Sequence, residues 1–338
     1  MRSVLVEGPR HMSLVERPMP DPAPGEVRVR VRYAGICGSD LHIFHGQHPY
    51  VQFPRIIGHE FAGHIDAVGA GVDTSLEGQR VAVTPVVTCG TCHSCQTGRS
   101  NVCLNLQVVG VHREGGFADY CCVPAECAVP LPDAVDDQAA ATVEPFSIAA
   151  NMLGRTGVLG EDTALVYGAG PIGMTVIQAL SGVHRLQHLV VADRIESRLD
   201  WARDSGATLT VNSAERPLSE ALQEAGLSPD LIIDAACHPA ILEEALDLAA
   251  PAARIGLMGF SPQASSVPQN KLNRKELTLY ASRLNNRKFP EVIDWMAQGL
   301  IQPERFISHS FKAEQVHDAF ALLGESPVEC CKVLLDFN

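Results

Sequence analysis

The apolar positions of this chain follow two different patterns, and each pattern predicts its own kind of domain. In the first 130 residues the apolar runs are short and alternate with polar residues. The clearest example is residues 26–33, where valines at every second position alternate with arginines, as in a half-buried strand. Shorter apolar runs predict further strands at residues 4–6, 12–15 and 80–83. We therefore expect an all-β domain here.

The second pattern covers residues 163–281, where apolar runs alternate with amphipathic segments. The runs predict strands at residues 164–167, 189–192, 209–211, 231–234, 254–258 and 277–280. The segments between them predict helices at residues 171–183, 195–205, about 217–226 and 239–250. Because strands interleaved with helices form a parallel sheet covered on both faces, we predict a doubly wound, Rossmann-type sheet.

The last part of the chain returns to the first pattern. A helix around residues 293–296 and a strand at residues 333–335 are assigned to the β domain. The predicted fold is thus α/β plus β, with a discontinuous catalytic domain (1–150 and 287–338) and an inserted nucleotide domain (151–286).

Composition narrows the class of protein. A length of 338 residues fits about two domains, and the net charge of −13 argues against a nucleic-acid or anionic-membrane partner. No apolar run approaches the ~18 residues of a membrane span. The first apolar run ends at Gly8-Pro9, too soon for a signal peptide. Eleven cysteines, an odd number in a long chain, favour a reduced cytoplasm over a disulfide framework.

The most informative stretch is Gly168-Ala169-Gly170-Pro171-Ile172-Gly173, between a predicted strand and a predicted helix. Gly168 allows the tight turn, Gly170 lets the backbone approach a pyrophosphate, and Gly173 lets helix and strand pack closely. The amino end of the helix offers free N–H groups to phosphates. This stretch predicts a dinucleotide site.

The acid that follows the next strand indicates which dinucleotide is bound. Asp193 lies twenty positions after Gly173, where it can accept hydrogen bonds from the adenosine ribose and repel a 2′-phosphate. We therefore predict NAD. Arg194 is the feature that could favour NADP, and Arg198 is a further candidate cofactor contact.

Four cysteines form a separate cluster. Cys89, Cys92, Cys95 and Cys103 are separated by two, two and seven residues, a spacing that can close a tetrahedral zinc site. An iron–sulfur cluster is the alternative, although the seven-residue gap and the absence of a following proline favour zinc. Closed coordination makes this metal structural, and it would hold together a lobe at residues 86–106.

A second metal site is predicted from residues set in glycine-rich turns. Cys37, His59 and Glu60 supply three ligands and leave one position open, as in catalytic zinc sites. Ser39 and His42 could carry a proton to solvent. Glu144 lies in an apolar stretch, where a buried acid needs a partner such as a metal or its bound water. Ordinary packing of a lone buried Cys or His is the alternative.

Together these motifs resemble the zinc-containing medium-chain dehydrogenases over essentially the whole chain, and most of all their sorbitol, threonine and sugar-acid branch. The resemblance implies a GroES-like β domain around a Rossmann domain, with the active site in a cleft between them. It makes Cys37, His59 and Glu60 zinc ligands, Glu144 an alternate ligand or partner of zinc-bound water, and Ser39 a proton relay. Two further residues match basic family positions, Arg283 in the cleft and Lys332 near the pyrophosphate.

The expected activity is NAD-linked, reversible oxidation of a secondary alcohol, with two zinc ions per chain. The resemblance favours a sugar acid such as L-gulonate, oxidised at carbon 5, with a polyol or L-threonine as alternatives. In such an acidic protein a substrate carboxylate must be met locally, by Arg113, Arg283 or His45. From a different class, the chain could be a catalytically idle NAD-binding regulator. The family also implies a homo-oligomer, either a dimer or a tetramer.

Overall fold

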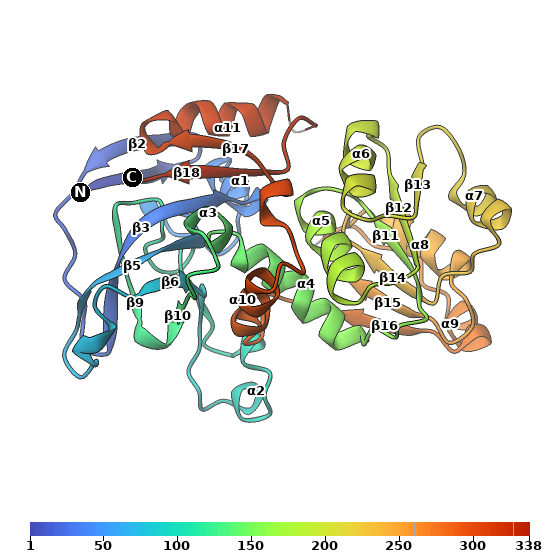
Figure 1. Cartoon of the computed structure of the whole chain (residues 1–338), viewed down its shortest axis with the longest axis horizontal. Helices are drawn as coiled ribbons and strands as arrows, with labels where there is room; N and C mark the ends of the chain where they lie inside the picture. The colour runs from blue at the N-terminus through green and yellow to red at the C-terminus, as the bar shows by residue number, and fades with distance from the viewer. Residues whose placement is uncertain (260, 327) are drawn as a thin grey trace. The chain divides into compact units, whose positions relative to one another are not determined.

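A computed structural model describes residues 1–259, 261–326 and 328–338, and these form two compact units (Figure 1). The first unit comprises Met1–Ser147, Asn285–Gln298 and Ile307–Asn338. The second comprises Ile148–Leu284 and Gly299–Phe306.

The first unit is built on β-sheets. Its strands are β1 (Arg2–Gly8), β2 (His11–Glu16), β3 (Glu26–Ile36), β4 (Arg55–Ile56), β5 (Glu60–Val68), β6 (Arg80–Val83), β7 (Val86–Val87), β8 (Gln107–Val108), β9 (Tyr120–Pro124), β10 (Ala128–Pro130), β17 (Ile307–Lys312) and β18 (Lys332–Asp336). The main sheet has the order β10-β6-β5-β3-β18-β17, and β9 also pairs with β3. The valines of β3 are buried, so the alternation predicted for residues 26–33 is confirmed.

Short helices join and cover these strands. They are α1 (Gly38–Phe44), α2 (His93–Gln96), α3 (Asp137–Ala140), the start of α4 (Val143–Thr156), α10 (Phe289–Ala297) and α11 (Val316–Glu325), with 3₁₀ turns η1 (Thr74–Leu76), η2 (Ser100–Val102), η3 (Ala125–Cys127) and η6 (Ala313–Gln315).

Three strands from distant parts of the chain meet at the end of β3. Gly35 of β3 pairs with Glu60 at the start of β5, and Ile36 pairs with Val333 near the start of β18. Figure 1 shows β18, drawn in red, beside β3, drawn in blue. A Cβ on Gly35 would lie 2.3 Å from a carboxylate oxygen of Glu60. Glycine at position 35 therefore leaves the space that the Glu60 side chain fills.

The second unit is the predicted doubly wound sheet. Its strands are β11 (Thr163–Tyr167), β12 (His188–Asp193), β13 (Leu209–Asn212), β14 (Leu231–Asp234), β15 (Arg254–Leu257) and β16 (Thr278–Ala281). They are all parallel, in the order β13-β12-β11-β14-β15-β16. The helices are α5 (Pro171–Gln178), α6 (Glu196–Asp204), α7 (Leu218–Ala225), α8 (Pro239–Leu248) and α9 (Gln269–Lys275), with a π turn η4 (Ala179–Val183) and a 3₁₀ turn η5 (Pro303–Arg305). All six predicted strands are present.

One segment belongs to a different unit from the predicted one. Residues 299–306 were assigned to the β domain but pack with the second unit. The side-chain amide of Gln178 donates to the Gln302 carbonyl at 3.2 Å, and the Gln302 N–H donates back at 2.8 Å. Gly182 has no Cβ, which would lie 1.8 Å from the Leu300 carbonyl oxygen. These contacts between residues far apart in sequence leave no local signal. No helix among the described residues is long and apolar enough to cross a membrane.

Candidate functional site

The turn that carries Cys37 is fixed by a buried carboxylate. Cys37 caps the start of α1, and its N–H donates to an oxygen of Asp40 at 2.8 Å. The other oxygen of Asp40 accepts from the Gly58 N–H at 3.3 Å. One fully buried side chain thus ties the Cys37 turn to the turn that precedes His59. The sequence analysis assigned no role to Asp40, although its place three residues after the helix cap is typical of a capping acid.

The three predicted ligands lie together. Donor atoms of Cys37, His59 and Glu60 are all within 4.8 Å of one another. The Nδ1 atom of His59 lies 3.7 Å from Asp40 and makes no hydrogen bond within the described residues. A carboxylate beside one ring nitrogen leaves the other for a metal. The set of thiolate, imidazole and carboxylate therefore fits a zinc ion with an open position.

The surroundings of this donor set shift the pKa of His59 and of the buried acid Glu144. Burial lowers the pKa of His59, but the neighbouring carboxylate of Asp40, helped by Cys37, raises it well above its usual value. Burial raises the pKa of Glu144 to about 7. Glu144 lies outside the group of three close donors, so its role as alternate ligand or partner of bound water remains a prediction.

Lys332 lies against the predicted ligand Glu60. Its ammonium lies 2.6 and 2.9 Å from the two oxygens of Glu60 and 3.1 Å from the Ile36 carbonyl. The contact with the pyrophosphate that the family resemblance implies remains a prediction. Lys332 is only 2 % exposed and Glu60 only 1 %. Its location at the start of β18 next to the end of β3 brings the ammonium into the metal site, so we assign Lys332 to that site.

The predicted proton path lies along one helix. Ser39 and His42 are three residues apart on α1, so they share a face of the helix. Ser39 is partly buried and His42 is exposed, with Nδ1 of His42 lying 3.3 Å from the side-chain oxygen of Gln47. The helix therefore leads from the Cys37 turn towards solvent, as a proton relay requires.

Polar rings that the sequence analysis did not single out as a group surround the same region. The Tyr50 ring stacks on His112 at 6.1 Å and meets His48 edge-on at 5.9 Å. The pKa of His48 is lowered by burial and then by the neighbouring His59 and His112. The charge of His59 thus reaches His48, which places these polar rings near the donor set.

Arg113 is not placed to contact a substrate at this site, contrary to one expectation. Its guanidinium pairs with Glu26 at the start of β3. Cys37 follows the opposite end of this strand, which has 11 residues, so roughly 30 Å of extended chain separates the two. An ion pair across the sheet leaves no local signal in the sequence.

The four cysteines of the predicted lobe also converge. Their sulfurs lie 3.5 Å apart for Cys92–Cys95, 3.4 Å for Cys89–Cys103 and 3.8 Å for Cys92–Cys103. Thiolates around one tetrahedral zinc stand about 3.8 Å apart, given Zn–S bonds of ~2.3 Å. Hydrogen bonds from Thr91, followed by the N–H of Cys92, lower the pKa of Cys89 to about 5. The arrangement fits one zinc ion better than a larger iron–sulfur cluster.

In the second unit the glycine turn has the predicted form. Gly170 caps α5, which begins at Pro171. A Cβ on Gly173 would lie 1.8 Å from the Gly168 carbonyl oxygen, so only glycine allows this packing. Asp193 accepts from the N–H groups of Ala169 at 2.7 Å, Arg194 at 2.7 Å and Ile195 at 3.0 Å. The predicted ribose ligand therefore also holds the turn in place.

Several predicted cofactor contacts line one cavity of about 350 Å³. They are Gly168, Asp193, Arg194 and Arg198. The guanidinium of Arg198 lies within 3.8 Å of a Cβ placed on Gly170, close to the turn where phosphates are expected. Ile172 lies in the first turn of α5. Arg283 is exposed just after β16, and its predicted role remains a prediction.

Comparison with known proteins now defines the class. The alcohol dehydrogenase GroES-like domain matches residues 23–133, and the zinc-binding dehydrogenase model matches residues 171–298. The chain belongs to the zinc-containing medium-chain dehydrogenases, and the resemblance drawn from its motifs is confirmed. It is an oxidoreductase of a class that uses zinc and a nicotinamide cofactor.

Individual relatives are similar over their whole length. The starvation-sensing protein RspB of Escherichia coli K12 is 53% identical over 338 residues, covering 100% of both chains. A crystal structure of RspB from E. coli CFT073, complexed with NADH, has a TM-score of 0.97 at 53% identity and covers 100% of this chain and 99% of that one. L-galactonate-5-dehydrogenase of E. coli K12 is 30% identical over 96% of this chain and 94% of its own.

The four-cysteine lobe yields a first prediction. Cys95→Ser removes one of four thiolates, so the zinc bound per chain should fall by about one ion, because structural sites need all four ligands. Metal analysis after dialysis measures this. Cys122→Ser, which changes a thiol outside both clusters, is the matched control. Retention of the full zinc content in Cys95→Ser would contradict the assignment.

The buried ion pair yields a second prediction. Lys332→Met leaves the Glu60 carboxylate buried without its cation, which should cost about 3–5 kcal/mol of stability. Lys332→Arg keeps the charge and should lose less. Urea unfolding of the zinc-loaded protein measures both changes. Equal stability of Lys332→Met and the unchanged protein would show that the pair is not needed.

Asp193 yields a third prediction. Asp193→Asn keeps the acceptor oxygen but removes the charge that repels a 2′-phosphate, so the preference for NADH over NADPH should fall by about tenfold or more. Fluorescence titration with both cofactors measures the ratio. Asp200→Asn, on the exposed surface of α6, is the control. An unchanged ratio would count against the assignment of Asp193.

Proposed function

We propose that this protein catalyses the reversible, NAD-linked oxidation of a secondary alcohol of a sugar acid, with L-gulonate or a related aldonate as substrate. The observation that carries the proposal is the donor set of Cys37, His59 and Glu60, in which His59 and Glu60 are buried and a fourth position on a zinc ion is left open. A protein that only sensed NAD would have no need of such a donor set.

We assign each residue of the site a role in the reaction. A zinc ion held there would supply a Lewis acid that lowers the pKa of an alcohol oxygen, and NAD would supply the hydride acceptor. Cys37, His59 and Glu60 hold the metal position. Ser39 accepts the alcohol proton, and His42 on the same face of α1 passes it to solvent.

The remaining groups hold the two sites in shape. Asp40 orients the His59 ring, and Lys332 compensates the charge of Glu60. In the second unit the turn from Gly168 to Gly173 offers its N–H groups to the pyrophosphate. Asp193 accepts hydrogen bonds from the ribose hydroxyls.

Two observations support a sugar acid over a simple alcohol. The rings of His48, Tyr50 and His112 offer hydrogen-bonding edges to a polyhydroxylated chain, whereas an aliphatic pocket would favour a small alcohol. A relative of 30% identity is an L-galactonate-5-dehydrogenase, which acts on a substrate of this class. Polyols and L-threonine are the competing substrates.

The test is NADH production from a panel of aldonates, polyols and L-threonine, using protein of measured zinc content. We expect selective turnover of L-gulonate or another aldonate. Cys37→Ser should lower kcat by several orders of magnitude, because the metal is lost, while NADH binding by fluorescence is retained. Cys122→Ser, on β9, is the matched control.

Each of the other outcomes would support a different function. Selective turnover of polyols or L-threonine would replace the sugar acid by that substrate. Turnover that persists in Cys37→Ser would remove the metal from the mechanism. NADH binding without turnover of any alcohol, in protein that carries two zinc ions, would favour an NAD-binding regulator.

A further inference from the structure

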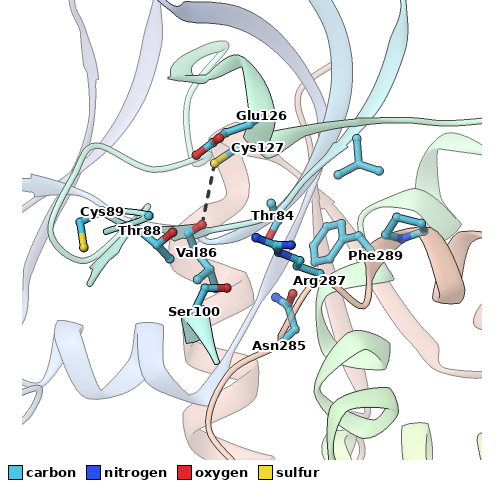
Figure 2. A pocket seen from close by; sticks show the side chains of 13 residues that line it. Thr84, Val86, Thr88, Cys89, Ser100, Glu126, Cys127, Asn285, Arg287 and Phe289 are labelled. Atoms are coloured by element: carbon cyan, nitrogen blue, oxygen red, sulfur yellow. Dashed lines mark hydrogen bonds between the residues drawn. The ribbon is translucent and has the colours of Figure 1, made fainter. Parts of the chain in front are cut away.

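A second polar cavity lies in the first unit, apart from the donor set of Cys37, His59 and Glu60. It encloses about 500 Å³, the size range of small-molecule sites. Figure 2 shows its lining, which comes from the zinc lobe, from η3 and from the chain that enters α10. None of the residues assigned to the reaction lines it.

One wall holds a buried donor that lacks an acceptor. Asn285 is 2 % exposed, and its side-chain NH₂ makes no hydrogen bond within the described part of the chain. A buried amide without a hydrogen-bond partner lowers the stability of the fold, so such groups usually donate to a ligand or an ordered water. Asn285 lines the cavity, and a small rotation of its side chain would bring the amide to an acceptor placed there.

A cation lies on the same wall. Arg287 follows Asn285 by two positions and also lines the cavity, and it makes no ion pair or hydrogen bond among the described residues. Its backbone has φ of +57°, a strained conformation for a residue with a side chain. The guanidinium of Arg287 and the amide of Asn285 together form a site for a carboxylate. The hydroxyl of Thr84 also lines the cavity.

The opposite side of the cavity carries the opposite charge. Glu126 of η3 also lines the cavity, forms no ion pair within the described ranges, and lies well away from Asn285 in Figure 2. Apolar side chains, Val129 and Phe289, contribute to the lining as well. A ligand that matches this arrangement has a carboxylate at one end, an ammonium at the other and methylenes between.

We propose that this cavity binds a small ω-amino carboxylate, with its carboxylate on Arg287 and Asn285 and its ammonium on Glu126. Charge selects this class, because a dicarboxylate would meet Glu126 with a like charge and a diamine would meet Arg287 with one. Glu126 and Asn285 stand apart in Figure 2, which favours an ω-amino acid over an α-amino acid. The proposal does not depend on the proposed alcohol substrate.

The test is calorimetric titration of the zinc-loaded, NADH-bound protein with a series from glycine to 6-aminohexanoate. We expect one site per chain and an optimum at an intermediate chain length. Butyrate and butylamine, each with one charged end of 4-aminobutyrate, should bind at least about tenfold more weakly than the best member of the series.

Variants locate the site. Arg287→Met and Glu126→Gln should each weaken binding by about tenfold or more, and Glu126→Gln should also abolish the advantage of the amino acid over butyrate. Arg30→Met, a matched loss of charge on the exposed face of β3, should leave binding unchanged. Cys37→Ser should also bind the ligand normally, because Cys37 does not line the cavity.

Three results would overturn the proposal. The first is that no member of the series binds. The second is that Arg287→Met and Glu126→Gln each bind as tightly as the unchanged protein. The third is that Cys37→Ser no longer binds. In the first case an ordered water accepts the hydrogen bond of the Asn285 amide. None of these results bears on alcohol turnover, which is measured separately.

Discussion

The buried ion pair between Lys332 and Glu60 is the contact on which the metal site depends. Removing two charges from water is costly, and their attraction offsets that cost only when geometry is good and the remaining donors are satisfied. Here one ammonium reaches both oxygens of Glu60 and the Ile36 carbonyl. The partners are 272 residues apart, so this ion pair requires β18 to lie beside β3.

The charge balance of the site also favours binding of a dication. Three carboxylates (Asp40, Glu60 and Glu144) are buried around one thiol, and the nearby basic groups are Lys332 and His59. Without a metal, protons must compensate the surplus of negative charge, and the pKa of His59, which Asp40 and Cys37 raise, expresses this. The pKa of Glu144 is raised first of all by its burial. Zinc replaces those protons, so metal binding and proton release at this site are linked.

Local motifs could be predicted from the sequence because neighbouring residues determine them. The glycine turn from Gly168 to Gly173 and the four cysteines from Cys89 to Cys103 lie within short segments, and their spacing alone specifies the chemistry. The contacts of Lys332, Arg113 and residues 299–306 could not be predicted, because their partners are distant in sequence. Asp40 was within reach of prediction, since an acid three residues after a helix cap is a known signal, but its contact with His59 was not.

The zinc lobe shows how one metal can replace a hydrophobic core. No residue of α2 is buried, and Leu104 is 81% exposed, so apolar burial contributes little to holding this segment. Asn286 links the lobe to the chain before α10: its amide donates to the Gly98 carbonyl at 2.7 Å, and its oxygen accepts from Ser100 at 3.2 Å. The four thiolates therefore fix the lobe internally, while Asn286 fixes it to the unit. Because Ser100 and Asn285 line the same cavity, the order of that cavity depends on the metal as well.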